Sequence, residues 1–374
     1  MVRTSVEGAS SESSDTAVAL SSNVKARSTN EFTTISALSS SVQGDFIVCG
    51  DDHGRIVLHD LITGNRITQL YKQKEGVETF TRSIHSIEWN ETAGIMSTLD
   101  LSAHLQIVKL VKNANMGWEK STTLLNECLY ELPVRQQLFS PDATRLIVAT
   151  SRWTFLYDLV EKRWVTKVGA RAQRCLWIKH PLDPRLVLLF EQLSIRTFTW
   201  ESLEQHFPMI SIEGHDGYDV DYEHYATCSQ TGKLFMRLVS SRPAQSSPAP
   251  RTYRISSLDL SHCEEGATLH FSHCFVDPSH LDIELIIGTT SDKVHNSSIL
   301  LFLTKSGTIC SIDLNKPVPQ RAYTRHFFVP SNWLSGTDSK ILKVTGKREV
   351  LVVQKDELAV FKNALDHQQV VDLS

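Results

Sequence analysis

The sequence predicts an all-β fold, a single seven-bladed β-propeller with four-stranded antiparallel blades. One phrase recurs along it, consisting of an apolar strand, a tight turn around Gly or Asp, and a short alternating strand. Its copies cover 46–60, 95–110, 146–159, 186–200, 225–238, 299–314 and 350–362. The closing strands lie mostly about 40 to 50 residues apart, the period of a propeller blade. Between the copies the pattern reads strand, turn, strand, with hardly any helical periodicity.

The length of 374 residues and the 41% hydrophobic content allow a large buried core. Length alone favours two domains. The repeat favours a single domain, because each blade packs only against its neighbouring blades and does not fold independently. Residues 1–30 are rich in Ser and poor in aromatics, so we expect a disordered leader before a propeller over 31–374. A Pro-rich segment predicts an insert loop at about 239–252.

The predicted strands can be followed blade by blade. The first blade begins at 32–38. The second comprises 84–89, 94–99, 105–110 and 118–125; the third 135–139, 145–150, 153–158 and 163–168; the fourth 174–178, 185–190, 194–200 and a poorer outer strand. Residues 212–318 are irregular, so eight blades, or six with an extension, remain open. The last strands are 327–329, 341–344, 350–353 and 358–361, and the tail 369–373 is expected to supply the outer strand of the last blade.

Three aromatic residues occupy the end of the first strand in successive blades: Trp89, Phe139 and Trp177. One large ring per blade at a fixed offset is typical of propellers, where it fills the wedge between adjacent sheets. We therefore expect core packing rather than an exposed aromatic platform.

Charge and cysteine usage restrict the partners and the compartment. The chain has 38 basic and 42 acidic residues, a formal charge of -4, so general nucleic-acid binding is disfavoured. Its seven cysteines are scattered singly, which indicates buried thiols in a reducing compartment. No window approaches the ~18 apolar residues of a membrane span. We expect a soluble cytoplasmic protein, no membrane partner and a monomer.

Two phrases resemble the WD40 repeat. Phe139-Ser-Pro-Asp-Ala-Thr-Arg-Leu-Ile-Val-Ala-Thr150 is similar to its "FSPDG" phrase, and Gly50-Asp-Asp-His-Gly-Arg-Ile-Val-Leu-His-Asp60 to the segment that closes on Trp-Asp. Gly214-His215 resembles its Gly-His opening. The repeats are degenerate, because Trp-Asp is replaced by His59-Asp60, Tyr157-Asp158 and Ile312-Asp313.

Over residues 42–210, segments 48–54, 69–72, 84–89 and 137–140 look like the C-terminal WD40 regions of fungal NACHT-type proteins, which are NLR-like and include vegetative-incompatibility proteins. This resemblance implies a surface that senses ligands or protein partners. The Gly-x-x-x-x-Gly-Lys-Ser/Thr phosphate loop of their switch module is missing here, so no nucleotide cofactor is expected. The chain is then a stand-alone propeller or a fragment of a longer protein.

No catalytic motif stands out, and we expect no enzyme, cofactor or metal site. His270 and Cys274 lie about 13 Å apart on an undistorted strand, too far to bind one zinc ion. His262, Cys263 and His273 lie near them, but the sequence contains no Cys-x-x-Cys pair. The segment 51–54 (Asp-Asp-His-Gly) reads as a turn, as do the strand-closing residues Asp60, Asp158 and Asp313.

The expected function is a non-catalytic scaffold or sensor that binds protein partners through loops between blades, at 71–83, 169–173, 213–218 and 316–321. Basic residues cluster between Lys162 and Arg185 and favour a solvated rim, or a docking patch for an acidic partner. The candidate partner-binding residues are Lys72, Lys74, Arg82, Arg171, Arg174, His215 and Arg321. The alternatives are a propeller hydrolase with carboxylates in its channel and a WD40 adaptor of another complex.

Overall fold

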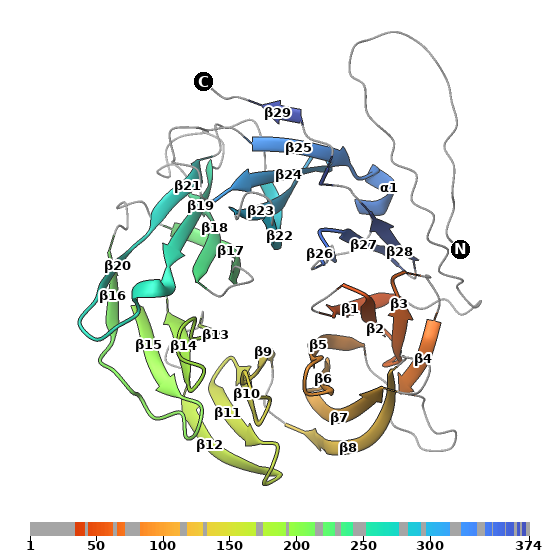
Figure 1. Ribbon diagram of the computed structural model, residues 1–374, viewed down its shortest axis with the longest axis vertical. Helices are drawn as coiled ribbons and strands as arrows, with labels where there is room; N and C mark the ends of the chain where they lie inside the picture. Colours follow the sequence, from red (N-terminus) through yellow and green to blue (C-terminus); the bar gives the residue numbers. More distant parts are fainter. Residues whose placement is uncertain are drawn as a thin grey trace. The chain divides into compact units, whose positions relative to one another are not determined.

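The computed structural model of the chain describes residues 34–41, 44–62, 66–71, 83–112, 118–129, 133–169, 175–191, 194–213, 220–228, 233–241, 252–276, 283–292, 297–314, 323–334, 341–345, 347–355, 357–362, 365–366 and 369–371. These residues form an all-β, propeller-like series of antiparallel sheets (Figure 1). Their helical segments are η1 (Leu260–His262) and α1 (Ser331–Leu334). Two compact units contain the described residues of Val24–Ile210 with Val353–Leu358, and of Ser211–Val352 with Ala359–Ser374.

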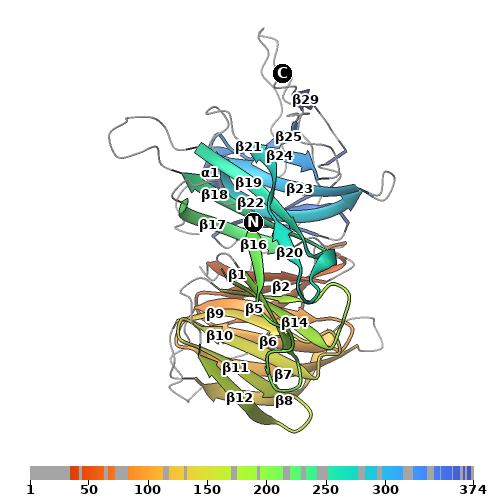
Figure 2. The same ribbon diagram turned by 90° about the vertical axis from the view of Figure 1, so that its left-hand side faces the viewer.

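Four sheets, called blades 1 to 4, each begin with four strands that follow one another in the chain, and the first unit contains them as far as Ile210 at the start of β16. Blade 1 contains β1 (Ile35–Ser40), β2 (Phe46–Asp51), β3 (Ile56–Asp60) and β4 (Arg66–Tyr71). Blade 2 contains β5 (Ile84–Asn90), β6 (Ile95–Asp100), β7 (His104–Lys112) and β8 (Trp118–Cys128). Blade 3 contains β9 (Val134–Phe139), β10 (Arg145–Thr150), β11 (Trp153–Asp158) and β12 (Arg163–Gly169), seen side by side in Figure 2. Blade 4 begins with β13 (Leu176–Lys179), β14 (Leu186–Glu191), β15 (Ser194–Thr199) and β16 (Ile210–Glu213).

Three further sheets lie mostly in the second unit. Blade 5 contains β17 (Val220–Cys228), β18 (Leu234–Ser241), β19 (Thr252–Asp259) and β21 (Ser272–Val276). Blade 6 contains β22 (Ile283–Asp292), β23 (Ser297–Thr304), β24 (Thr308–Asp313), β25 (Tyr323–Phe328) and β29 (Gln369–Val371). A last sheet has three described strands: β26 (Leu342–Val344), β27 (Val350–Gln354) and β28 (Glu357–Phe361).

Burial differs between the strands of a blade in a way that explains the repeated phrase. All six residues of β14 are buried, and so are five of the six in β10, whereas the outer strand β12 has none. A strand covered on both faces reads as a continuous apolar run, while a half-exposed one alternates. The phrase therefore marks the second and third strands of most blades.

Side-chain hydrogen bonds join the first strands of successive blades. Ser36 Oγ donates to the carbonyl oxygen of Ile84 at 2.7 Å, linking β1 to β5. Gln136 donates through Nε2 to the carbonyl oxygen of Trp177 at 2.7 Å and accepts from its backbone N–H at 2.8 Å, linking β9 to β13. The Gln136 amide thus satisfies the backbone of a neighbouring strand that no sheet partner reaches on that side.

The three aromatic residues are buried between blades, as predicted. Trp89, Phe139 and Trp177 are 8%, 1% and 2% exposed. Each belongs to a hydrophobic cluster drawn from two consecutive blades, 1 and 2, 2 and 3, and 3 and 4 respectively. They therefore fill the wedges between adjacent sheets and offer no exposed platform.

Close packing of β2 against β5 leaves no room for a side chain at Gly50. A Cβ atom there would lie 2.7 Å from Cβ and 2.6 Å from Cγ2 of Ile84. We expect Gly50→Ala to lower the free energy of unfolding by about 1 to 3 kcal/mol, as overpacking does. Gly169→Ala is the matched control, because its Cβ would meet nothing closer than Trp153 at 3.6 Å. Urea denaturation measures both; equal stabilities of the two variants would contradict this packing of blade 1 on blade 2.

The predicted seventh four-stranded blade is not observed: six sheets have four or more strands and the last sheet has three described ones. The tail was expected to be the outer strand of the last blade. Instead β29 pairs with β25 and extends blade 6, with Tyr323 opposite Val371. A short apolar segment can pair with any free strand edge, and the sequence does not say which edge it meets.

The predicted irregularity in 212–318 has a structural origin. The copy at 225–238 corresponds to β17 and β18, the first two strands of blade 5, and not to the second and third. The proline-rich segment connects the adjacent strands β18 and β19. The chain then leaves blade 5, β20 (Thr268–His270) pairs in parallel with β16, and β21 returns to pair with β19. The excess length is therefore an excursion to blade 4 and not a further blade.

Five of the cysteines have described surroundings, and three of them are buried: Cys49, Cys263 and Cys310. Burial raises the pKa of each of these thiols to about 12. They stay protonated at neutral pH and act as small apolar core residues. Cys128 is exposed and Cys175 is half-buried.

Candidate functional site

The turn between β9 and β10 is held by one carboxylate. Asp142 accepts hydrogen bonds from Ser140 Oγ at 2.6 Å, from Thr144 Oγ1 at 2.9 Å and from the Thr144 backbone N–H at 3.1 Å. Partial burial would raise the pKa of Asp142, but these hydrogen bonds outweigh it and lower the pKa. Ala143 takes the left-handed conformation at φ 56°, which Gly adopts more readily than other residues. The Ser-Pro-Asp phrase is thus a rigid, charged turn.

The turn between β13 and β14 carries an exposed ion pair. Arg185 donates to Asp183 from Nε at 3.0 Å and from an NH2 nitrogen at 2.7 Å. Side-chain and then backbone hydrogen bonds from Arg185 lower the pKa of Asp183 to about 2. The two charges therefore compensate each other across the whole neutral range.

The connection from β15 to β16 folds back on its own strand. The backbone N–H groups of Thr199 and His206 donate to the carbonyl oxygens of Glu204 and Thr197. The Trp200 N–H donates to the carbonyl oxygen of Arg185 at 3.0 Å, which ties the connection to the start of β14. Trp200 is 5% exposed and packs in the cluster between blades 3 and 4.

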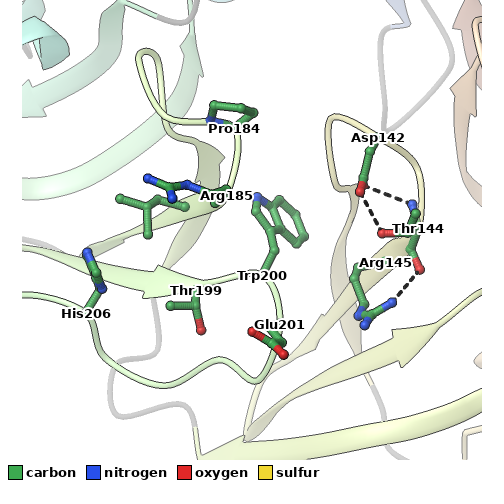
Figure 3. Close-up of a pocket in the computed structure, with 10 residues that line it drawn as sticks. Asp142, Thr144, Arg145, Pro184, Arg185, Thr199, Trp200, Glu201 and His206 are labelled. Atoms are coloured by element: carbon green, nitrogen blue, oxygen red, sulfur yellow. Dashed lines mark hydrogen bonds between the residues drawn. The ribbon is translucent and has the colours of Figure 1, made fainter.

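These three segments enclose a pocket of about 510 Å³ (Figure 3). Its lining residues come from the turn of blade 3, the turn of blade 4 and the β15–β16 connection: Asp142, Thr144, Arg145, Pro184, Arg185, Leu186, Thr199, Trp200, Glu201 and His206. Pockets of roughly 300 to 1,000 Å³ are the size that holds small molecules or a few side chains of a peptide. We call it the blade 3/4 pocket.

A buried ion pair supports one wall of the blade 3/4 pocket. Arg145 lies 3.0 Å from Oδ2 of Asp158, whose side chain is 5% exposed. Oδ1 of Asp158 accepts the backbone N–H groups of Val160 and Glu161, each at 2.8 Å. One carboxylate therefore closes β11, as predicted for a turn residue, and also positions Arg145.

Two donors at the blade 3/4 pocket have no acceptor among the described residues: the indole N–H of Trp200 and the Nε–H of Arg145. A buried donor without an acceptor costs about 1 to 3 kcal/mol. Neither atom is exposed. Both nitrogens are covered by protein atoms, so a ligand in the pocket does not reach them in this structure.

Three apolar side chains are exposed in strand connections of blades 3 and 4, the two blades that line the blade 3/4 pocket. Leu182 lies two residues before Pro184, Met209 three residues after His206, and Val160 two residues after Asp158. Their exposed fractions are 54%, 50% and 67%. Each lies in a connection between the first and second or between the third and fourth strand of its blade. When successive strands of a sheet are antiparallel neighbours, these connections lie at the same end of the sheet. Exposed apolar groups beside a pocket are typical of an interaction surface.

The structure does not describe the partner-binding residues predicted from sequence. Lys72, Lys74, Arg82, Arg171, Arg174, His215 and Arg321 are outside the described residues, so the pocket brings none of them into view. Of the basic cluster between Lys162 and Arg185, Arg185 lines the blade 3/4 pocket, while Lys167 stacks on Trp153 with its Nζ 4.1 Å from the ring centre.

The segment 51–54 is a turn, as predicted. Asp51 accepts the backbone N–H groups of His53 and Arg55, and its Oδ2 lies 2.7 Å from Nε of Arg55. Asp52 accepts from Thr34, and Gly54 has φ 76°. Across the described part of the chain, no cluster of three or more His, Cys, Asp or Glu side chains is arranged to hold a metal ion.

The sequence reasoning missed the blade 3/4 pocket. Part of its lining belongs to a segment that the sequence singles out, since the phrase that begins with Ser-Pro-Asp supplies Asp142 and Thr144. The remaining lining comes from Pro184 and Arg185 and from the connection after Thr199, and nothing local indicates that these segments meet. Only the packing of blade 4 on blade 3 brings them together.

Among the described residues, no helix is both long and apolar enough to cross a bilayer. Comparison of the sequence with protein-family models and with curated proteins gave no match.

Proposed function

We propose that this chain is a non-catalytic protein-interaction module whose partner binds at the blade 3/4 pocket. The observation that carries this function is the pocket of about 510 Å³ with exposed Leu182, Val160 and Met209 within three residues of its lining or of Asp158. A rigid sheet scaffold that presents a concave site between turns is a common basis for recognition.

The state of the charged groups favours binding over catalysis. Asp142 is engaged by three hydrogen bonds of its own turn, and Arg145 and Arg185 are each paired with a carboxylate. An acid–base catalyst needs a group within reach of the substrate whose proton is free to move. Glu201 and His206 also line the pocket, and both are exposed.

We further propose a degenerate WD40 propeller in which the sheet β26–β28 is the seventh blade. Its first strand β26 contacts β22, and a Cβ at Gly288 of β22 would lie 3.2 Å from Val344 of β26. The backbone N–H of Ile35 in β1 donates to the carbonyl oxygen of Lys355, in the turn between β27 and β28. The Ser-Pro-Asp phrase supports the WD40 type. The segments that look like fungal NACHT-type proteins support a relationship to those sensors. We propose that the chain is a monomer in the cytoplasm.

A peptide selection tests the proposed function. Random 12-residue peptides displayed on phage are selected on the full chain, and the best are synthesised with a fluorophore. We expect the selection to give peptides that bind the wild-type chain. Their affinity for the Glu201→Trp variant should be at least tenfold lower, because an exposed lining residue is replaced by one that blocks the mouth of the pocket.

Glu204→Trp is the matched control, since Glu204 is exposed on the same connection but does not line the blade 3/4 pocket. Fluorescence anisotropy gives the affinities, and far-UV circular dichroism checks that both variants fold. Peptides that bind both variants as tightly as the wild type, or no peptide at all, would contradict the proposed function.

A further inference from the structure

We propose that the blade 3/4 pocket recognises a basic peptide segment, and that it binds a Lys or Arg side chain of the partner through the exposed carboxylates of its lining. This inference rests on the proposed function and specifies the chemistry of the partner. The basic cluster between Lys162 and Arg185 favoured an acidic partner, whereas the charges at the pocket itself favour the opposite one.

Both arginines of the pocket lining are paired with carboxylates that do not line the pocket. An NH1 nitrogen of Arg145 lies 3.0 Å from Oδ2 of Asp158, and an NH2 nitrogen of Arg185 lies 2.7 Å from Oδ2 of Asp183. An acidic side chain of a partner would meet each guanidinium group with a carboxylate already beside it. The two arginines therefore bring no uncompensated positive charge to the pocket.

Two carboxylates of the lining have no such partner. Asp142 and Glu201 are exposed, and neither takes part in an ion pair among the described residues. Partial burial would raise the pKa of Asp142, but the hydrogen bonds of its turn lower it, so this carboxylate stays ionised at neutral pH. With both arginines cancelled and His206 counted as neutral, these two carboxylates are the charge that remains in the lining. A cationic ligand would compensate it.

The rest of the lining suits the aliphatic part of a basic side chain. Lys and Arg combine an apolar stem with a charged end, and the stem can lie along apolar surface while the end stays among polar groups. Pro184, Leu186 and Trp200 supply apolar surface in the same pocket (Figure 3). The volume of about 510 Å³ exceeds that of one side chain and leaves space for a neighbouring residue of the peptide. A basic residue next to an apolar one therefore matches both the charge and the size of the pocket.

The test uses fluorescent peptides obtained by the selection on the full chain, which we expect to contain Lys or Arg. Glu201→Lys reverses one charge of the lining and should weaken their binding about tenfold, because it replaces attraction by repulsion. Glu204→Lys is the matched control: Glu204 is exposed on the same connection but does not line the pocket, so the affinity should stay within about twofold of wild type. Asp142→Asn keeps an oxygen for the turn and removes a charge, and should weaken binding about threefold if Glu201→Lys fails to fold.

A charge swap identifies the group on the peptide. A selected peptide whose basic residue is replaced by Glu should bind the wild-type chain weakly and should bind Glu201→Lys more tightly than it binds the wild type. Raising NaCl from about 50 to about 500 mM should weaken the wild-type complex about fivefold, because salt screens attraction between exposed charges.

The outcomes separate this inference from the proposed function. Selected peptides without a basic residue, or peptides blocked by Glu201→Trp yet bound normally by Glu201→Lys and Asp142→Asn, would overturn the inference and leave the proposed function intact. Equal losses for Glu201→Lys and Glu204→Lys would overturn it too, since they would indicate a general effect of charge and not recognition in the pocket. Binding that survives Glu201→Trp contradicts the proposed function itself.

Discussion

Replacing Trp177 with alanine is expected to lower the free energy of unfolding by about 3 to 5 kcal/mol, the cost of removing a large buried aromatic side chain. Trp177 is 2% exposed and lies 5.2 Å, centre to centre, from the ring of Phe198. Its indole N–H donates to Thr154 Oγ1 at 3.1 Å. This hydrogen bond joins β13 of blade 4 to β11 of blade 3. The loss should therefore loosen the contact between two blades as well as the core of one.

Two further variants separate the contributions at Trp177. Trp177→Phe keeps most of the apolar area but leaves Thr154 without its donor, and we expect a loss of about 1 to 2 kcal/mol. Trp153→Ala is the control, because Trp153 is only half-buried and Lys167 covers its ring. Urea denaturation followed by far-UV circular dichroism measures all three. A loss at Trp177→Ala no larger than that at Trp153→Ala would contradict the wedge role.

Replacing Asp158 with alanine is expected to cost about 3 kcal/mol, near the lower end for breaking a buried ion pair. The substitution removes the partner of Arg145 and the oxygen that accepts two backbone hydrogen bonds in the turn after β11. The lower end applies because the Arg145 side chain is 21% exposed and water can reach part of it. Arg145 should also lose its fixed position in the blade 3/4 pocket, so peptide binding should weaken together with stability.

The control for Asp158 is Asp183→Ala, which breaks the other ion pair of the blade 3/4 pocket. The Arg185 side chain of that pair is 86% exposed, so the cost should stay below about 1 kcal/mol. Asp158→Asn keeps an oxygen for the turn and removes only the charge, and should fall between the two. Thermal and urea denaturation give the three values; equal losses for Asp158→Ala and Asp183→Ala would show that burial does not distinguish the pairs.

The sequence was most informative where local chemistry decides the structure. Trp89, Phe139 and Trp177 were assigned to the wedges from their position in the repeat, and Asp51 and Asp158 to turns from their place after a strand. Both assignments depend on a strand and the few residues that follow it. The same is true of the continuous apolar runs of β10 and β14, because burial on both faces acts on every residue of the strand.

Pairing over long distances was not predictable in the same way. The tail strand β29 pairs with β25, whose residues lie 44 to 48 positions earlier, and β20 leaves blade 5 to pair with β16. These short strands have compatible edges in more than one place, and only the assembled sheets select one. The blade 3/4 pocket is missed for the same reason, since Asp142, Arg185 and Trp200 become neighbours through the packing of two blades.

Hydrogen–deuterium exchange of the full chain, with and without a selected peptide, tests the central claim most directly. If the blade 3/4 pocket is the interaction site, the peptide should slow exchange in segments 140–145, 183–186 and 199–206 and leave the loops 71–83 and 169–173 unchanged. Slowed exchange in those two blade-joining loops, with no change around Asp142, Arg185 and Trp200, would contradict it.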